Sequence, residues 1–85
     1  MNNTIDQFWY VYILLMSNGK YYTGYTQNII ERLERHQNGM VPYTKPYRPV
    51  ELIFYSAFKD KYLALSFEKY LKSGSGRAFM AKHLV

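Results

Sequence analysis

Runs of apolar residues, separated by short polar or glycine-containing segments, predict three strands and three helices. The first strand covers residues 8–16, FWYVYILLM, where nearly every position is apolar or aromatic. An unbroken run of this kind is typical of a central strand that is buried on both faces. The segments KYYTGYT (residues 20–26) and VELIFYSA (residues 50–57) are the expected second and third strands.

The turn between the first two strands has the sequence SNG, which permits two hairpin registers. A two-residue Asn-Gly turn would pair Met16 with Tyr21, and a three-residue loop would pair Met16 with Lys20. A slip of one residue exchanges the two faces of a strand, so only the three-residue loop puts Tyr12 and Tyr22 on the same face. We predict the three-residue loop.

The segment QNIIERLERH predicts a helix that is capped by Thr26 or Asn28 and is stopped by the following Asn-Gly pair. At about 100° per residue, its apolar side chains form one buried stripe: Ile29, Ile30 and Leu33. Arg32 and His36, one turn apart, lie along an edge of that stripe. Arg35 points to solvent together with two glutamates. The helical pattern therefore predicts that Arg32 lies near the core and Arg35 in solvent, a difference that composition alone does not show.

Residues 40–49, MVPYTKPYRP, contain all three prolines and cannot form a helix. Basic Lys45 and Arg48 alternate with Tyr43 and Tyr47. This segment is either a rigid surface loop or a loop that faces nucleic acid, and we prefer the structural interpretation.

Two helices are expected after the third strand. The first begins at a cap on Asp60 and ends near Ser73, and its apolar stripe consists of Leu63, Ala64, Phe67, Tyr70 and Leu71. Glu68 lies at the margin of that stripe. The segment SGSG then breaks the chain, and residues 77–84 can form a last short helix.

The length of 85 residues allows one small domain. We expect residues 1–7, MNNTIDQ, to be a disordered tail and residues 8–85 to form the domain. The chain has no cysteine, which excludes disulfides and thiolate metal sites and fits a reducing compartment. Because the N-terminus lacks an apolar signal region and no run approaches a membrane span, we expect a soluble cytoplasmic protein with no membrane partner.

The net charge is +5, from eleven Lys and Arg against six Asp and Glu, and the chain also has ten tyrosines. This balance favours an anionic partner, of which nucleic acid is the commonest. Tyrosine offers a stackable ring and a hydroxyl, although small β-containing cores also use many tyrosines.

Several chemistries fail because the necessary residues are missing. Two-ion nucleases need several converging acidic ligands, but Glu31 and Glu34 point to solvent and Asp60 is needed as a cap. The only histidines, His36 and His83, exclude a histidine-rich metal site. No serine has a nucleophile-elbow setting, and SGSG is not a Walker loop. What remains is one carboxylate and one arginine at stripe edges, one histidine and a pair of hairpin tyrosines.

This residue set suits phosphodiester cleavage, which needs an activated nucleophile, stabilised negative charge and an assisted leaving oxygen. The planar fork of an arginine matches phosphate oxygens. One glutamate can hold an Mg²⁺ ion whose other positions are taken by water and phosphate. A tyrosine base needs assistance, because ionising a phenol with a free pKa near 10 costs about 4 kcal/mol at pH 7.

Through these residues the chain resembles the GIY-YIG nuclease superfamily over nearly its whole length. The first family tripeptide appears here as Val11-Tyr12-Ile13 and the second as Tyr22-Thr23-Gly24. The family arginine, ten residues beyond the second tyrosine, falls on Arg32, and the residue one turn later is His36. The family glutamate, on the helix after the third strand, falls on Glu68.

Within the superfamily the chain looks closest to the small stand-alone bacterial branch, through its Thr44…Pro49…Leu52 loop and its ending EKYLKSGSGR. The resemblance implies an α+β fold, in which helices flank a three-stranded antiparallel sheet in the order β-β-α-β-α-α. It also implies hydrolysis of DNA phosphodiesters, as in DNA repair, with one divalent ion, Mg²⁺ or Mn²⁺. A tyrosine-linked base would activate the water, without a covalent intermediate.

We expect each matching residue to have one role. Arg32 would clamp the scissile phosphate and Glu68 would hold the metal. Tyr22 would be the general base, Tyr12 would order the water and His36 would relay the proton. Further contacts to nucleic acid are expected from Tyr25, Lys45, Arg48, Lys72, Arg77 and Lys82.

Two departures from the family pattern stand out. Val11 and Thr23 replace the family Gly and Ile at structural positions, where we expect little effect. Tyr25 follows the second motif, where some relatives have a lysine that could lower the pKa of the tyrosine base. Assistance here would have to come from His36, Arg32 or the metal-bound water.

Other interpretations stay open. Tyr12 and Tyr22 could be two core tyrosines, and Glu68 could form an ordinary helical salt bridge with Lys72 at i+4. A non-cleaving nucleic-acid-binding module could use the same cleft, and a protein–protein adaptor could use exposed tyrosines. With no appended DNA-binding domain in this sequence, specificity would come from a protein partner, from a homodimer, or from branches and nicks in the DNA.

Overall fold

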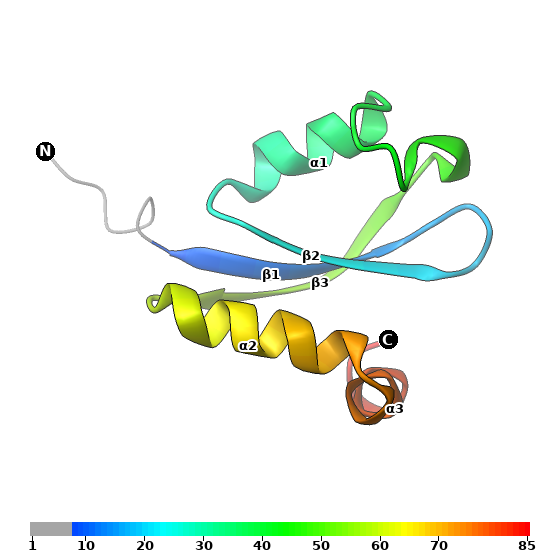
Figure 1. Cartoon of the computed structure of the whole chain (residues 1–85). Helices are drawn as coiled ribbons and strands as arrows, with labels where there is room; N and C mark the ends of the chain where they lie inside the picture. The colour runs from blue at the N-terminus through cyan, green and yellow to red at the C-terminus, as the bar shows by residue number, and fades with distance from the viewer. Residues whose placement is uncertain (1–7) are drawn as a thin grey trace, which may run out of the picture.

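One antiparallel sheet separates two groups of helices in the computed structural model, which describes residues 8–85. The elements in chain order are β1 (Trp9–Leu15), β2 (Tyr21–Thr26), α1 (Ile29–Gln37), the short 3₁₀ turn η2 (Lys45–Tyr47), β3 (Glu51–Phe58), α2 (Lys61–Lys72) and α3 (Gly74–His83). Strand β1 lies between β2 and β3. Figure 1 shows α1 over one face of the sheet and α2 with α3 on the other side. The predicted α+β fold is confirmed, and the predicted tail lies outside the described residues.

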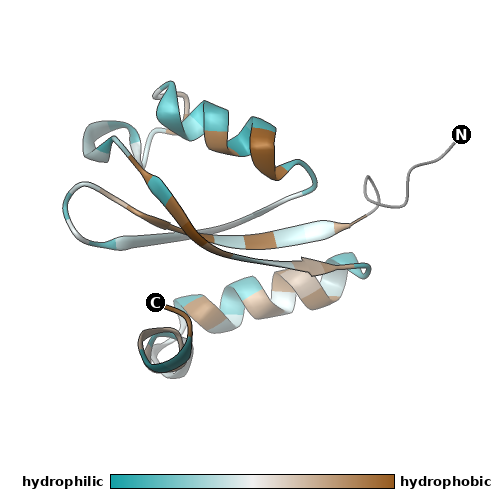
Figure 2. Ribbon diagram, turned by 180° about the vertical axis from the view of Figure 1, so that it is seen from behind, coloured by the Kyte–Doolittle hydropathy of each residue, from teal (hydrophilic) through white to brown (hydrophobic). Residues whose placement is uncertain are grey.

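Strand β1 is buried on both faces, as its unbroken apolar run predicts. On the side of α2 and α3, the buried core consists of Val11, Ile13, Ala64, Leu71 and Met80. On the side of α1, it consists of Tyr12, Leu14, Met16 and Val50. Figure 2 shows the apolar colour along parts of the strands, between the two groups of helices. Burial of these apolar side chains is the main force that holds the layers together.

The β1–β2 hairpin has the predicted three-residue loop. Gly19 has a φ of +81°, in the left-handed region that glycine adopts without steric cost. The loop closes with a hydrogen bond of 2.8 Å from the Met16 amide to the Lys20 carbonyl. The resulting register puts Tyr12 and Tyr22 on the same face of the sheet, toward α1.

The buried stripe of α1 differs from the predicted one. Ile29 and Leu33 pack against the core and His36 is fully buried, whereas Ile30 is 72 % exposed. The three inward residues follow the i, i+4, i+7 row that a helix presents to one surface. His36 therefore belongs to the centre of the stripe and not to its edge, and Ile30 lies beside it.

The predicted stripe of α2 is too wide for the same reason. Ala64 and Leu71 are fully buried, but Leu63 is 58 % and Tyr70 41 % exposed. Each exposed residue lies one position before a buried one and so points about 100° away from the sheet.

The helix starts follow the predicted caps, except in α3. The side chains of Asn28 and Asp60 cap α1 and α2. Helix α3 begins earlier than predicted, at Gly74, because the Ser73 hydroxyl accepts a hydrogen bond from the Gly76 amide at 3.1 Å and caps the helix. The segment SGSG is thus a tight junction between α2 and α3.

The proline-rich segment 40–49 forms no α-helix, as predicted, and contains only the short turn η2. It is held against the end of α1, because the Gln37 side chain donates to the Val50 carbonyl at 2.7 Å and accepts from the Val50 amide at 3.3 Å. None of the helices between residues 8 and 85 has the length and apolar content needed to cross a bilayer.

Candidate functional site

A pocket of about 300 Å³ lies at the open edge of the sheet, beside β2. Its walls are formed by Trp9, Tyr12, Tyr22, Gly24, Tyr25, Thr26, Gln27, Arg32 and Glu68. Because β2 is an edge strand, side chains from the two layers of helices can meet around it. Arg32 from α1 and Glu68 from α2 therefore line the same cavity as Tyr12 and Tyr22. The structure places these four side chains as the sequence analysis expected, while their chemical roles stay predictions.

Gly24 makes room for Tyr12 at this edge. The two residues are opposite each other in the sheet. A Cβ atom at position 24 would lie 2.5 Å from the Tyr12 hydroxyl oxygen and 2.7 Å from the ring carbon that carries it. The Tyr12 ring therefore passes over bare backbone to reach the pocket, and the glycine of the second tripeptide is what permits this.

A chain of hydrogen bonds holds the Tyr12 hydroxyl from behind. Its oxygen is 3.0 Å from Nε2 of His36, and Nδ1 of His36 is 2.7 Å from the Thr44 hydroxyl. The Thr44 hydroxyl also lies 3.5 Å from the Val41 carbonyl, to which it can donate. A neutral imidazole has one nitrogen that donates and one that accepts, so His36 can join the two hydroxyls in a single chain.

Burial keeps Tyr12 and His36 uncharged. Burial raises the pKa of Tyr12, the nearby Tyr22 acts in the same direction, and the Arg32 guanidinium opposes both. Burial, reinforced by the positive charges of Arg32 and Arg35, lowers the pKa of His36 from 6.5 to about 4. At pH 7 the pair consists of a neutral imidazole and a phenol, which act through hydrogen bonds and not through charge.

Tyr22 lines the pocket and its ring also contacts His36. The Tyr22 and His36 rings meet edge to face, with 5.0 Å between their centroids. Within the part of the chain that the structure describes, no hydrogen bond joins these two side chains, and both ring nitrogens of His36 already have other partners. The proton relay from Tyr22 through His36, which the sequence analysis expected, therefore lacks the contact it requires.

Helix α1 separates its two arginines as the helical pattern predicts. Arg32 is partly buried and lines the pocket, whereas Arg35 is exposed. For the described residues, Arg32 is the one cationic side chain among those that line this pocket. Its guanidinium is therefore the group in the pocket that can neutralise a phosphate directly.

Glu68 carries an ion pair on one of its two oxygens. Its Oε2 atom is 2.9 Å from Nζ of Lys72, one turn further along α2, which is the ordinary helical contact that the sequence also allows. Within residues 8–85, no group of three or more His, Cys, Asp or Glu side chains could hold a metal ion. One carboxylate at a pocket wall suits an ion such as Mg²⁺, which keeps several waters and takes oxygens from substrate phosphates. Glu68 thus fits a one-ion site and not a two-ion site.

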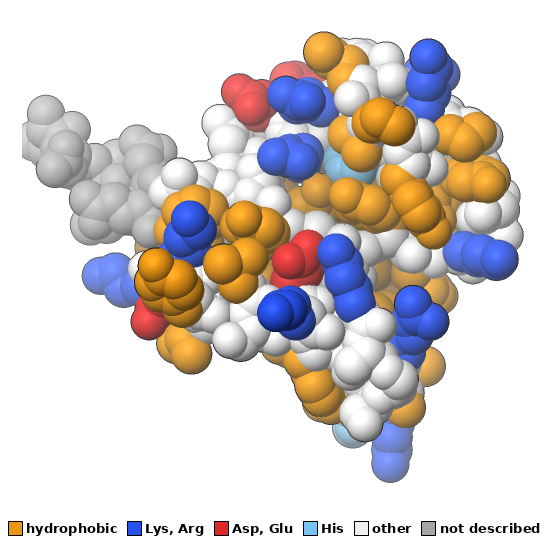
Figure 3. Space-filling view, viewed as in Figure 1, with side chains coloured by type: hydrophobic (Ala, Val, Ile, Leu, Met, Phe, Trp, Pro, Cys, Tyr) orange, Lys and Arg blue, Asp and Glu red, His pale blue; other side chains and the backbone are white. Residues whose placement is uncertain are grey.

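Three of the predicted nucleic-acid contacts lie in or beside the pocket. Tyr25 lines the pocket itself, and its ring centroid is 5.8 Å from that of Trp9. Lys72 and Arg77 line a neighbouring groove of about 720 Å³, which shares Tyr22 with the pocket. On the face shown in Figure 3, basic side chains (blue) lie beside the acidic side chain (red) at the centre of the view.

Lys45, Arg48 and Lys82, the other predicted contacts, line neither cavity. The Arg48 guanidinium donates to the carbonyls of Lys45, at 3.0 Å, and Gln37, at 3.2 Å. It therefore ties the proline-rich loop to the end of α1, which agrees with the structural interpretation of this loop. Lys45 and Lys82 are exposed away from the pocket and the groove.

Thr44 is the main site residue that the sequence analysis missed. In the sequence this threonine stands out only as part of a family-like loop, whereas the structure buries it completely against His36. No periodicity exists in a proline-rich loop, so nothing in the pattern marks Thr44 as buried. Trp9 and Gln27 in the pocket wall were missed as well.

The fold and the pocket together define a GIY-YIG domain. The model of the GIY-YIG catalytic domain matches residues 8–82, so the chain belongs to the GIY-YIG family. This is a nuclease superfamily, whose members generally use a divalent metal ion and act on nucleic acid.

Relatives of this chain include bacterial proteins of the UPF0213 group. A UPF0213 protein of Pediococcus pentosaceus is 42 % identical over 64 residues, which cover 74 % of this chain and 67 % of that protein. One of Staphylococcus saprophyticus is 40 % identical over 67 residues, which cover 78 % and 82 % of the two chains. The solution NMR structure of a UPF0213 protein from Bacillus halodurans superposes with a TM-score of 0.57 and 32 % identity, over 88 % of this chain and 83 % of that chain. These findings confirm the resemblance that the motifs indicated.

Proposed function

We propose that this protein is a DNA endonuclease that recognises the structure of its substrate and hydrolyses a phosphodiester bond with one divalent ion, Mg²⁺ or Mn²⁺. The observation that supports this most strongly is the meeting of Arg32, Glu68, Tyr12 and Tyr22 in one pocket. These residues come from four different elements, α1, α2, β1 and β2. Together they offer a cation, an anionic ligand and two hydroxyls to a single phosphate.

Arg32 has the role of binding the phosphate. Its fork of N–H donors matches two phosphate oxygens. In hydrolysis the phosphorus gains a bond to the water oxygen and loses the bond to one ester oxygen, so negative charge grows on the other oxygens. A guanidinium already held at the pocket wall stabilises that charge without reorganisation.

Glu68 would hold the ion through its carboxylate. When bound, the divalent ion would act as a Lewis acid that stabilises charge on the phosphate and the leaving oxygen. For this the Glu68 carboxylate must leave its partner Lys72 or share itself between the two cations.

The two tyrosines have different roles in this proposal. Tyr22 is the leading candidate for the base: after its phenol has lost a proton to solvent, the phenolate takes the proton from the attacking water, and solvent returns a proton to the leaving oxygen. Tyr12 orders that water through its hydroxyl, which the raised pKa keeps protonated. His36 and Thr44 position Tyr12 through the hydrogen bonds behind it. We thus place His36 as a positioning residue in place of the relay.

Nicking of branched, nicked and flapped DNA tests this proposal. Arg32→Ala and Glu68→Gln should each lower kcat by about 10²–10³-fold, as expected for the loss of one charge-stabilising group. Arg35→Ala is the matched control, because Arg35 is on the same helix but exposed, and it should cleave like the wild type. Equal cleavage by Arg32→Ala, Glu68→Gln and the wild type would contradict the catalytic roles proposed for these two residues.

A second candidate function is a nucleic-acid-binding module that does not cleave. The ion pair between Glu68 and Lys72 favours it, because a carboxylate neutralised by a lysine need not serve a metal. Saturable DNA binding without metal, with a steep salt dependence and no cleavage of any substrate, would support this function. We further propose that the protein acts in the cytoplasm in DNA repair, with specificity from DNA structure, a protein partner or a homodimer.

A further inference from the structure

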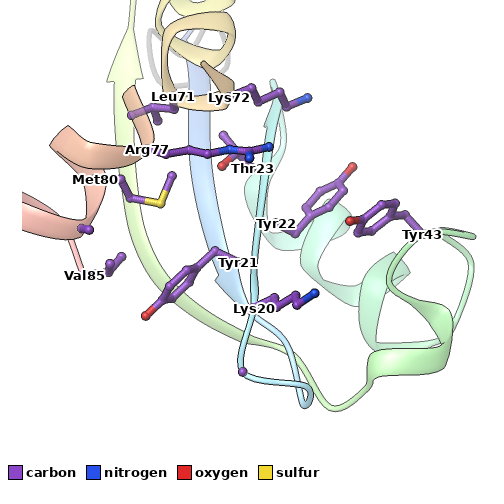
Figure 4. A pocket seen from close by; sticks show the side chains of 12 residues that line it. Lys20, Tyr21, Tyr22, Thr23, Tyr43, Leu71, Lys72, Arg77, Met80 and Val85 are labelled. Carbon is purple, nitrogen blue, oxygen red and sulfur yellow. The ribbon is translucent and has the colours of Figure 1, made fainter. Parts of the chain in front are cut away.

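The groove beside the pocket is built to hold an anion. It lies between β2 and the junction of α2 with α3, and Figure 4 shows the side chains around it. Its basic residues are Lys20, Lys72 and Arg77, and its aromatic residues are Tyr21, Tyr22 and Tyr43. Within the described residues, no Asp or Glu lines it. The charge of the groove therefore complements a phosphate backbone, and its tyrosines can contact bases or sugars.

The segment SGSGR, which the pocket does not use, ends at Arg77, and Arg77 lines this groove. A side chain on Gly76 would collide with the Tyr70 carbonyl, so only glycine allows α3 to turn off directly from the end of α2. Figure 4 shows Arg77 and Lys72 extending in the same direction, toward β2 near Thr23. The tight junction thus puts a second cation next to Lys72.

Lys72 lies between the two cavities. Its side chain lines the groove, while its Nζ atom is 2.9 Å from Glu68, which lines the pocket. The Lys72 side chain is 53 % exposed and the Glu68 side chain 13 %. Because solvent reaches the lysine end of the pair, a phosphate in the groove can compete with Glu68 for the lysine.

We propose that the groove binds the phosphodiester backbone next to the reacting phosphate, and that Lys72 then exchanges Glu68 for a backbone phosphate. This inference rests on the proposed nuclease function. While Lys72 pairs with Glu68, its positive charge opposes a divalent cation at the same carboxylate. When a phosphate takes Lys72, Glu68 is released for the ion. Nucleic acid and ion therefore bind with positive coupling, and each raises the affinity for the other by the same factor.

Titration with Mn²⁺ followed by electron paramagnetic resonance tests the exchange. The nucleic acid is an oligonucleotide with phosphorothioate linkages, which resist cleavage, and its own Mn²⁺ binding is subtracted. In the wild type, the oligonucleotide should raise the Mn²⁺ affinity several-fold. Lys72→Met should bind Mn²⁺ several-fold more tightly without the oligonucleotide and should lose most of the coupling. Lys69→Met, on an exposed position of the same helix, should behave like the wild type.

The groove itself is tested by the salt dependence of oligonucleotide binding without metal. Lys20→Met and Arg77→Met should each weaken binding and reduce the slope of log K against log[salt] by about one. Lys82→Met is the control, since Lys82 is on α3 but does not line the groove. Equal weakening by all three variants would show a diffuse charge effect and overturn the groove.

The outcomes separate this inference from the nuclease proposal. Wild-type Mn²⁺ affinity and wild-type coupling in Lys72→Met would overturn the exchange, even if the protein cleaves DNA with the help of Arg32 and Glu68. Absence of Mn²⁺ binding in every variant would overturn the exchange together with the metal role of Glu68. If Mn²⁺ and the oligonucleotide bind with a coupling that depends on Lys72, but the protein cleaves no DNA, the result would contradict the nuclease proposal alone.

Discussion

The two walls of the pocket hold their functional groups in different ways. On the α1 side, Tyr12, His36 and Thr44 are at most 2 % exposed, uncharged and joined by hydrogen bonds. On the α2 side, Glu68 and Lys72 form a charged pair in which the glutamate is 13 % and the lysine 53 % exposed. A satisfied polar network inside a core has one preferred arrangement, whereas a lysine that solvent reaches can exchange its partner for water or another ion. The first wall is fixed and the second can exchange partners.

This difference suits a hydrolytic site. Groups that orient water and phosphate contribute most when they are in place before the reaction. A metal ion and a polynucleotide must enter and leave, so the groups that bind them benefit from weak initial contacts. If the comparison is correct, changes to the α1 wall alter stability strongly and changes to the α2 wall alter it little.

Acid should have the largest effect, through His36. Its pKa is about 4 in the folded protein against an ordinary value of 6.5, so between these values the unfolded chain binds a proton that the folded chain does not. The free energy of unfolding should therefore fall as the pH drops from 6.5 to about 4, by at most about 3 kcal/mol, and this group has no effect above that range. Urea titrations near pH 7.5 and near pH 4.5 measure the loss.

The control for this prediction is His36→Gln. This variant should be less stable than the wild type at pH 7.5, and it should lose less stability on acidification because the titrating imidazole is absent. The same loss in both proteins would assign the acid sensitivity to another group and would remove His36 from the comparison.

Thr44→Val should have the next largest effect. Valine has nearly the same shape but leaves Nδ1 of the buried His36 without a partner, which costs about 2 kcal/mol of unfolding free energy. Thr44→Ser keeps the hydroxyl and should lose much less. In cleavage assays, Thr44→Val should lower kcat more than it changes KM, since Tyr12 is no longer held in place. A valine variant as stable as the serine variant would show that the hydroxyl does not matter.

Gly24→Ala tests the other support of Tyr12. The added Cβ would lie 2.5 Å from the Tyr12 hydroxyl oxygen, and Tyr12 is packed too closely to move freely. Overpacking of this kind should cost about 1–2 kcal/mol of unfolding free energy and lower the cleavage rate. Gly74→Ala is the matched control, because a Cβ at that position meets nothing within 4 Å. Equal stability of the two variants would contradict the close packing of Tyr12 over Gly24.

The comparison also shows what the sequence can predict. The strands, the hairpin register and the caps on Asn28 and Asp60 follow from local patterns, and the structure confirms them. The shared pocket of Arg32 and Glu68 was expected from the resemblance to the GIY-YIG family, whose motifs occur here in the same order. These features depend on residues close together in sequence or on the order of a few elements.

The details of the fixed wall could not be predicted in this way. A helical pattern gives the spacing of apolar residues, but packing against the sheet decides which row turns inward, and here it buries His36 and exposes Ile30. The partner of His36 is Thr44, in an irregular loop without periodicity. The contact in the exchangeable wall was easier to predict, since Glu68 and Lys72 are four residues apart on one helix. Their contact follows from helix geometry alone.

Lys72→Met should have the smallest effect on stability. Loss of an exposed i, i+4 ion pair costs about 0.3–0.5 kcal/mol, and methionine keeps much of the apolar stem and the helix propensity. The difference from the wild type should shrink further in high salt, because screening weakens the pair in the wild type. Urea titrations at low and high salt, beside Lys69→Met as a control on the same helix, measure it. A loss above about 1 kcal/mol that persists in high salt would mean that Lys72 is as firmly held as Thr44, and the proposed contrast between a fixed and an exchangeable wall would fail.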